Sequence, residues 1–114
     1  MPLIYPHERQ VLALNGLYAA DHSLSPVLRL WFPTNSLQWF LTHTRADDPD
    51  LAYGLAVEGG LRPVYELGYW SLEAFEAFGR GAPGTRLQSS SVFRFVMPLS
   101  GYVRSLARGG QRRR

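Results

Sequence analysis

Four segments with the alternation of a β-strand follow one another between residues 26 and 72, and only short connections separate them. They are VLRLWFP, LQWFLTHTR, LAYGLAVEGG and YELGYWSL. A parallel crossover needs about a dozen residues or more, so consecutive segments this close together pair antiparallel. The pattern therefore predicts an α+β domain with a four- or five-strand, mostly antiparallel sheet and helices packed on it.

Helical patterns lie on both sides of these strands. PHERQVLALNG predicts a first helix that begins at Pro6 and stops at its closing Asn-Gly pair. Ser71 is a good N-cap for a second helix, in which apolar residues recur at helical spacing up to Gly79. A third helix opens at Pro98 with an amphipathic i, i+3, i+4, i+7 pattern. The residues of this pattern are Leu99, Tyr102, Val103 and Leu106.

Two further segments and one run of small residues complete the fold prediction. GRGAPGTRLQSSS is rich in Gly, Pro and Ser and predicts a loop, and VFRFVM after it predicts a short last strand. In the third strand segment, Ala52, Gly54 and Ala56 share one face. Small residues leave room for a neighbour to lie close, and the simplest such neighbour is a helix.

The length and the apolar content suit one small domain. The chain has 114 residues, of which 46% are hydrophobic, enough for a single core. We expect residues 1–108 to form this domain and residues 109–114 to form a disordered basic tail. Without Cys the chain has neither disulfides nor thiolate metal sites, and no apolar run approaches the roughly 20 residues of a membrane span. The start of the chain does not read as a signal peptide, so we expect a soluble, cytoplasmic protein with no membrane contact.

The positive charge is concentrated at the C-terminus. All twelve cationic residues are Arg, and five of them lie in the last eleven positions. Residues 1–103 carry seven Arg and nine acidic residues, a net charge of −2. A short basic tail can contact phosphate, so nucleic-acid binding is an alternative function, although an Arg-only composition also arises from GC-rich codon usage. The candidate residues for this alternative are Arg108, Arg112, Arg113 and Arg114.

The motifs of common enzymes are missing from the sequence. It has no phosphate loop, dinucleotide-binding fingerprint, zinc spacing or nucleophile elbow. His43 could act as a base, but no Ser, Cys or Lys stands at a recognisable spacing from it, which favours a structural role. Asp47, Asp48 and Asp50 could hold a hard cation, but they lack the loop of a calcium hand, and turn formation explains them more simply. We therefore predict a protein that is not an enzyme and has neither a metal nor another cofactor. A hydrolase or transferase centred on the Asp cluster and Glu66 is the remaining enzymatic alternative, and it needs those carboxylates in one pocket.

The chain has more large rings than one face of a sheet can easily bury. Trp31 falls opposite Leu30 and Phe32 in the alternation, so either helices cover both faces or some rings are exposed. Exposed Tyr and Trp beside Arg are typical of binding hot spots. The stretch PVYELGYWSL combines such rings with a carboxylate, Glu66, at a strand-to-helix corner. This carboxylate either pairs with a nearby Arg for structural reasons or lines a groove for a partner.

The order of four segments resembles a known family. The segments are PVLRLWFP, WFLTHTRADDPDLAYGL, ELGYWSL and the PLS near the C-terminus, and the likeness covers about residues 6–103. DDPDLAYGL and ELGYWSL, in this order and spacing, are its most specific parts. The family is an uncharacterised bacterial one, the domain of unknown function number 2958, which occurs largely on plasmids, phages and integrative elements.

The resemblance implies an accessory role on a mobile element, because the family's genes often lie near antirestriction and conjugation genes. We expect a non-catalytic binding protein that acts on a host protein or defence complex, in an antirestriction or anti-CRISPR type of role. Family members tend to carry a Glu-Arg-Asp step before the last strand, whereas this chain reads GTRLQSSSVFRF there. Arg86 and Arg94 remain as candidate cations, and the resemblance gives no support to a function that rests on the missing acids.

The expected contact surface is the segment Glu66–Trp70 together with the turn Asp47–Asp50. The most specific resemblance falls on these residues, and a core needs apolar alternation without demanding Glu66 or the Asp cluster. The candidate binding residues are Glu66, Tyr69, Trp70, Asp47, Asp48, Asp50, Arg86 and Arg94.

Overall fold

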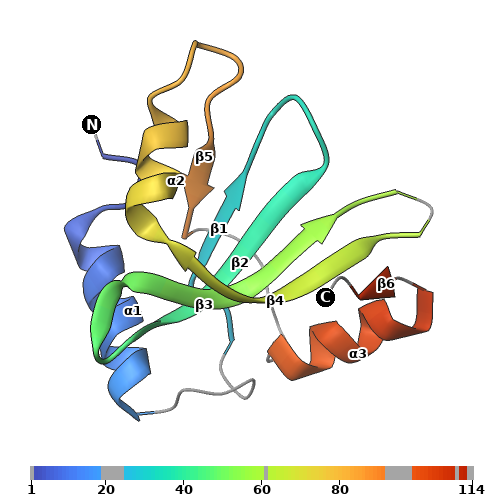
Figure 1. Ribbon diagram of the computed structural model, residues 1–114, viewed down its shortest axis with the longest axis horizontal. Helices are drawn as coiled ribbons and strands as arrows, with labels where there is room; N and C mark the ends of the chain where they lie inside the picture. Colours follow the sequence, from blue (N-terminus) through green and yellow to red (C-terminus); the bar gives the residue numbers. More distant parts are fainter. Residues whose placement is uncertain (1, 19–24, 61, 92–98, 110, 113–114) are drawn as a thin grey trace.

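Six strands and three helices make up the structure, a computed structural model that describes residues 2–18, 25–60, 62–91, 99–109 and 111–112. Figure 1 shows the strands in one twisted sheet, with α1 and α2 on one side of it and α3 on the other. The helices are α1 (Pro6–Tyr18), α2 (Leu72–Gly79) and α3 (Leu99–Gly109). The strands are β1 (Leu28–Trp31), β2 (Leu37–Arg45), β3 (Asp48–Glu58), β4 (Val64–Ser71), β5 (Gln88–Ser90) and β6 (Gln111–Arg112).

The strands form one sheet in the order β5-β1-β2-β3-β4-β6. The first five pair antiparallel, and β6 runs parallel to its neighbour β4. This confirms the predicted α+β class with a mostly antiparallel sheet. The loop predicted at residues 79–91 is wrong at its end, because residues 88–90 pair with β1 as an edge strand. Edge pairing uses backbone hydrogen bonds, so the polar run QSS carries no alternation that could reveal it. The strand predicted at VFRFVM lies outside the described residues.

Apolar side chains pack on both faces of the sheet. Neighbouring strand residues point to opposite faces, so Trp39 belongs to one core cluster and Phe40 to the other. The first cluster includes Leu12 of α1 together with Leu72 and Phe75 of α2. The second cluster includes Leu99 of α3. Helices thus cover both faces, and some rings, among them Tyr69, are exposed as well.

Helix α1 continues past the Asn-Gly pair at which the sequence predicts its end. Asn15 Nδ2 donates a hydrogen bond to the backbone oxygen of Thr42 at 2.9 Å. Gly16 lies so close to β2 that a Cβ atom there would overlap the carbonyl oxygen of Thr44. These contacts with β2 outweigh the local stop signal, and Gly16 serves close packing of backbone on backbone instead of a turn.

The small residues of β3 have two different neighbours. Ala52 and Ala56 face the first cluster, which includes α2, as the prediction of a covering helix requires. Gly54 instead lies against β2, where a Cβ atom would overlap the carbonyl oxygen of Phe40. The pairing of β2 with β3 shifts register directly after Leu41, so the close approach at Gly54 accompanies a β-bulge.

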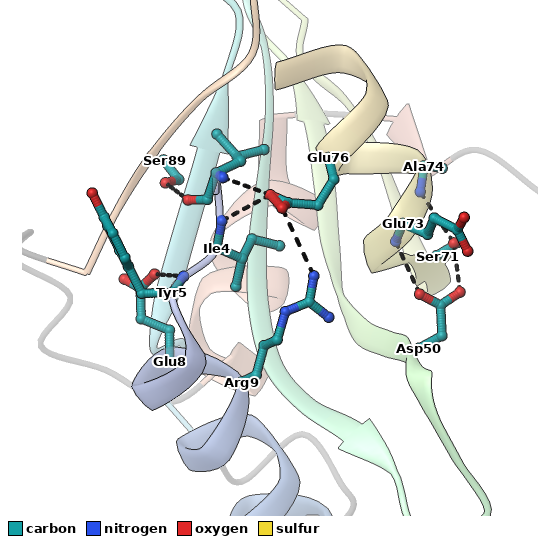
Figure 2. Close-up of polar contacts among 11 residues, drawn as sticks. Ile4, Tyr5, Glu8, Arg9, Asp50, Ser71, Glu73, Ala74, Glu76 and Ser89 are labelled. Atoms are coloured by element: carbon teal, nitrogen blue, oxygen red, sulfur yellow. Dashed lines mark hydrogen bonds and ion pairs between the residues drawn. The ribbon is translucent and has the colours of Figure 1, made fainter. Parts of the chain in front are cut away.

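One carboxylate of α2 holds the N-terminal segment in place (Figure 2). Glu76 Oε1 accepts hydrogen bonds from the backbone N–H groups of Leu3 at 2.6 Å and Ile4 at 2.9 Å. Its other oxygen lies 4.0 Å from Nη2 of Arg9 in α1. Ile4 is fully buried, so Glu76 satisfies backbone donors that water cannot reach easily.

The two predicted helix signals after β4 are confirmed. Ser71 is the N-cap of α2, and its Oγ accepts the backbone N–H of Ala74 at 3.2 Å. In α3, the buried Leu99 and the half-buried Val103 and Leu106 pack on the second cluster, as the amphipathic pattern predicts. Pro98 and the side chain of Tyr102, the other parts of that prediction, lie outside the described residues.

The last described residues belong to the sheet. Gln111 and Arg112 form β6 and pair with Val64 and Tyr65 of β4. Two positions of the tail for which we expect disorder are therefore paired to a strand. Among the helices that the structure describes, none is both long enough and apolar enough to cross a membrane.

Candidate functional site

Three aromatic side chains form a row across β2, β3 and β4. The register places His43 opposite Tyr53 and Tyr53 opposite Tyr69, so the three side chains share one face of the sheet. The rings of His43 and Tyr53 are stacked with their centroids 5.2 Å apart, and the rings of Tyr53 and Tyr69 meet edge-on at 5.0 Å. Tyr53 also packs against the second cluster, so the row continues the core that α3 covers.

The row runs from the interior to the surface. His43 is buried, and its Nδ1 lies 2.9 Å from Oγ1 of Thr42. Tyr53 is half-buried, and 44% of Tyr69 is exposed. A surface ring that rests on further rings has little conformational freedom left to lose, so it is well prepared for contact with a partner.

A salt bridge borders the exposed ring of Tyr69. Arg45 donates from Nε to Oδ1 of Asp47 at 2.9 Å and from Nη2 to Oδ2 at 2.7 Å, which is bidentate geometry. The guanidinium carbon of Arg45 lies 5.6 Å from the ring centroid of Tyr69. The hydrogen bond from Arg45 lowers the pKa of Asp47, and the same hydrogen bond raises the pKa of Arg45. Both residues are exposed, so the pair places opposite charges beside the ring.

A pocket of about 240 Å³ opens at this point, where the end of β2 meets α1. Its lining residues are Gly16, His43, Thr44, Arg45, Ala46, Asp47 and Tyr69. Pockets for drug-sized ligands measure about 300–1,000 Å³, so this one has room for a group about the size of one side chain. We call His43, Arg45, Asp47, Tyr53 and Tyr69 together the Tyr69 site.

The Tyr69 site offers several kinds of non-covalent contact. It presents a ring edge and face, a phenol hydroxyl and one charged pair, which together stack on, accept from and donate to polar side chains. Within the described ranges, no three His, Asp or Glu side chains come together as the ligands of a metal ion would.

The structure brings Asp47 and Tyr69 together, but it separates them from Glu66 and Trp70. Glu66 pairs with Ala56 and Trp70 packs on the first cluster, so both side chains lie on the face that α2 covers. Tyr69 lies on the other face because side chains alternate along β4. The residues predicted as one contact surface are thus divided between the two faces of the sheet.

The other two carboxylates of the turn have local roles. Asp48 Oδ1 accepts the backbone N–H of Asp50 at 3.0 Å, which is the turn chemistry that the sequence favours over a metal site. Asp50 accepts hydrogen bonds from the N-terminal end of α2, including one from Ser71 Oγ. The carboxylates required by the enzymatic alternative therefore do not converge, since Glu66 pairs with Ala56, six residues or about 20 Å along β3 from Asp50.

The candidate Arg residues are scattered. Arg86 is half-buried in the connection between α2 and β5. Arg108 is exposed on α3, and Arg112 belongs to β6. Arg94, Arg113 and Arg114 lie outside the described residues.

The sequence alone does not reveal that His43, Arg45 and Tyr53 belong to one site with Tyr69. His43 reads as an isolated residue, because its ring partners come from other strands. A regular two-residue hairpin with Arg45 opposite Asp48 would place His43 opposite Asp50, whereas the shifted register places it opposite Tyr53. The sequence does not show that β2 and β3 pair irregularly, and this pairing is what brings His43 beside Tyr53.

Comparison with known proteins identifies the family. No curated protein and no solved structure matches the chain. The family model described as "Protein of unknown function (DUF2958)" matches residues 3–112, which is almost the whole chain. The match confirms the resemblance seen in the sequence and includes every residue of the Tyr69 site. The chain belongs to the DUF2958 family.

Proposed function

We propose that this protein is a non-catalytic binding protein of a bacterial mobile element or phage, which acts in the cytoplasm on a host protein. The proposal of a mobile element or phage rests on the likeness to a family found largely on such elements. Among host-directed roles, we favour an anti-defence role against restriction or CRISPR systems. The Tyr69 site is the proposed contact surface.

One observation supports this function above others, namely the exposed ring of Tyr69 in contact with both a ring row and a salt bridge. Tyr69 is fixed on its inner side by Tyr53, and Arg45 lies over it. Aromatic anchors with a charged rim carry most of the binding energy in protein interfaces, and the loss of such an anchor costs about 2 kcal/mol or more. Glu66 lies about 20 Å along the sheet from Asp50, and this distance supports binding over hydrolysis.

The first experiment captures partners from a bacterial lysate with immobilised protein. Wild type, Tyr69→Ala and Tyr5→Ala are compared, because Tyr5 is also an exposed tyrosine, on the N-terminal segment. We expect a host protein that wild type and Tyr5→Ala retain, and that Tyr69→Ala binds about thirtyfold more weakly when it is purified. Recovery of nucleic acid without any protein, or equal retention by both variants, contradicts the proposal.

A second experiment tests the anti-defence role directly. Phage plating is measured on a host with an active restriction or CRISPR system, with and without the protein. We expect the protein to raise the plating efficiency and Tyr69→Ala to abolish the effect at equal protein level. No change in plating on any such host would leave host-protein binding in place but remove the anti-defence role.

The alternative function, nucleic-acid binding, has one supporting observation. Arg104 and Arg108 are exposed one helical turn apart on α3, next to the basic tail. A salt titration on duplex DNA tests this function, since each phosphate contact contributes about −0.9 to the log–log slope. Deleting residues 109–114 would also remove β6, so Arg104→Gln with Arg108→Gln is the better variant. We expect this pair to flatten the slope by about 2 if the alternative is right.

A further inference from the structure

A second pocket lies at the opposite end of β2, where the β1–β2 hairpin turns. It measures about 220 Å³, and its lining residues are Arg29, Trp31, Phe32, Asn35, Ser36, Leu37, Gln38 and Gly59. We call it the hairpin pocket. Its walls are well defined, because Asn35 Oδ1 accepts the backbone N–H of Leu37 at 2.9 Å and Gly59 donates its backbone N–H to the oxygen of Ser36 at 3.3 Å.

Arg29 is held in place inside this pocket by two contacts. Its guanidinium carbon lies 4.4 Å from the ring centroid of Trp31, two residues along the same face of β1. Its Nε donates a hydrogen bond to Oε1 of Gln38 at 3.0 Å. Gln38 is the register partner of Trp31, so the three side chains form one group. A guanidinium fixed in this way loses less conformational entropy when it binds a ligand.

The described lining of the pocket supplies hydrogen-bond donors but no negative charge. Among the described residues, Arg29 forms no ion pair, whereas Arg9 pairs with Glu76 and Arg45 pairs with Asp47. The one side-chain hydrogen bond of Arg29 within the described residues uses Nε, so both Nη atoms are available to a ligand. The Oδ1 atom of Asn35 is occupied, which leaves its amide N–H groups as donors, and the Ser36 hydroxyl is beside them in the lining.

We propose that the hairpin pocket binds the carboxylate of a Glu or Asp side chain on the protein partner. A single planar guanidinium matches a planar carboxylate with two parallel hydrogen bonds. The described lining offers one cation, and its volume is below that of small-molecule pockets, which suits one acidic side chain better than a nucleotide. That the carboxylate belongs to a protein partner rests on the proposed function, whereas the affinity of the pocket for a carboxylate does not.

The test uses NMR titration with a defined peptide. The probe is an acetylated and amidated Gly-Glu-Gly-Glu-Gly peptide, and its control replaces both Glu by Gln. The reporter is the indole N–H of Trp31, assigned among the three Trp of the chain with Trp31→Phe. We expect saturable shifts with the Glu peptide and none with the Gln peptide.

Matched variants decide whether Arg29 is responsible. Arg29→Gln should weaken peptide binding about tenfold or more, since it removes charge-assisted hydrogen bonds. Arg29→Lys keeps the charge but lacks the planar guanidinium with its parallel N–H donors, so it should also weaken binding. This second variant tests the role of Arg29 even if Arg29→Gln loosens the hairpin. Arg104→Gln removes the same charge from exposed α3 and should leave binding unchanged.

Three results overturn the proposal: equal shifts with the Gln peptide, equal losses in Arg29→Gln and Arg104→Gln, or a Trp31 response to inorganic phosphate or duplex DNA instead of the Glu peptide. Tyr69→Ala should not affect peptide binding. The peptide titration therefore tests the hairpin pocket alone, and capture of the host protein tests the Tyr69 site. A negative result in one experiment does not decide the other.

Discussion

Asp50 and Ser71 are 21 residues apart in the chain and 2.6 Å apart in the structure, from Ser71 Oγ to Asp50 Oδ2. The other carboxylate oxygen, Oδ1, accepts the backbone N–H of Glu73 at 2.9 Å. Ser71 is itself the N-cap of α2, so a residue of β3 completes the cap of a helix that follows β4. Asp50 therefore joins the sheet to α2, and its negative charge also suits the positive end of the helix dipole.

This relationship predicts that Asp50→Ala destabilises the fold without a direct effect on binding at the Tyr69 site. The variant leaves a helix N–H without its acceptor, so we expect the free energy of unfolding to fall by about 1–2 kcal/mol in urea titrations. Asp48→Ala, which removes one exposed turn contact, is the control and should cost about 0.5 kcal/mol. Loss of partner binding in the folded fraction of Asp50→Ala would instead return Asp50 to the contact surface.

A second prediction concerns the close approach of β2 and β3 at Gly54. Gly54→Ala inserts a methyl group onto the carbonyl oxygen of Phe40, so the strands must separate, at a cost of about 2–3 kcal/mol. Gly68→Ala in β4 is the matched control, because the atom nearest to its Cβ would be 3.9 Å away, on the Trp70 ring. Thermal unfolding followed by circular dichroism measures both. Equal melting temperatures for the two variants would contradict the packing described for β2 and β3.

Glu76 provides a third prediction. Glu76→Ala leaves the backbone N–H groups of Leu3 and Ile4 without their acceptor, and we expect the unfolding free energy to fall by about 2 kcal/mol. Hydrogen exchange of the Ile4 amide should become faster. Glu73→Ala changes an exposed acid in the same helix and should leave this amide protected. An unchanged exchange rate in Glu76→Ala would show that Glu76 does not hold the N-terminal segment.

The fourth prediction is a pH dependence at the Tyr69 site. The hydrogen bond from Arg45 lowers the pKa of Asp47 below its ordinary value of 3.8, so the pair stabilises the fold above that pH. The contribution is lost as the pH falls through the lowered pKa. NMR titration of the Asp47 carboxyl should show the low pKa in wild type and an ordinary one in Arg45→Gln. The same pKa in both would mean that the two side chains do not pair in solution.

The sequence by itself determined the central four-strand meander and the presence of three helices. Four segments alternate, and the connections between them are short. Connections this short are too short for a parallel crossover, so consecutive strands pair antiparallel and form a meander. Ser71 was recognisable as a helix N-cap because its chemistry acts on backbone groups three residues away. The amphipathic pattern of α3 was equally local. These features depend on neighbours in the chain, which is why they could be predicted.

The tertiary structure alone decided where the candidate site lies. The irregular register of β2 and β3 pairs His43 with Tyr53, whereas a regular register would pair it with Asp50. Alternation along β4 places Tyr69 and Glu66 on opposite faces. Tertiary contacts of Asn15 and Gly16 with β2 also extend α1 beyond the Asn-Gly stop signal. Register and close packing depend on pairs of residues that are distant in the chain. Local propensity contains no information on such pairs, because a shift of one residue in pairing exchanges the two faces of a strand.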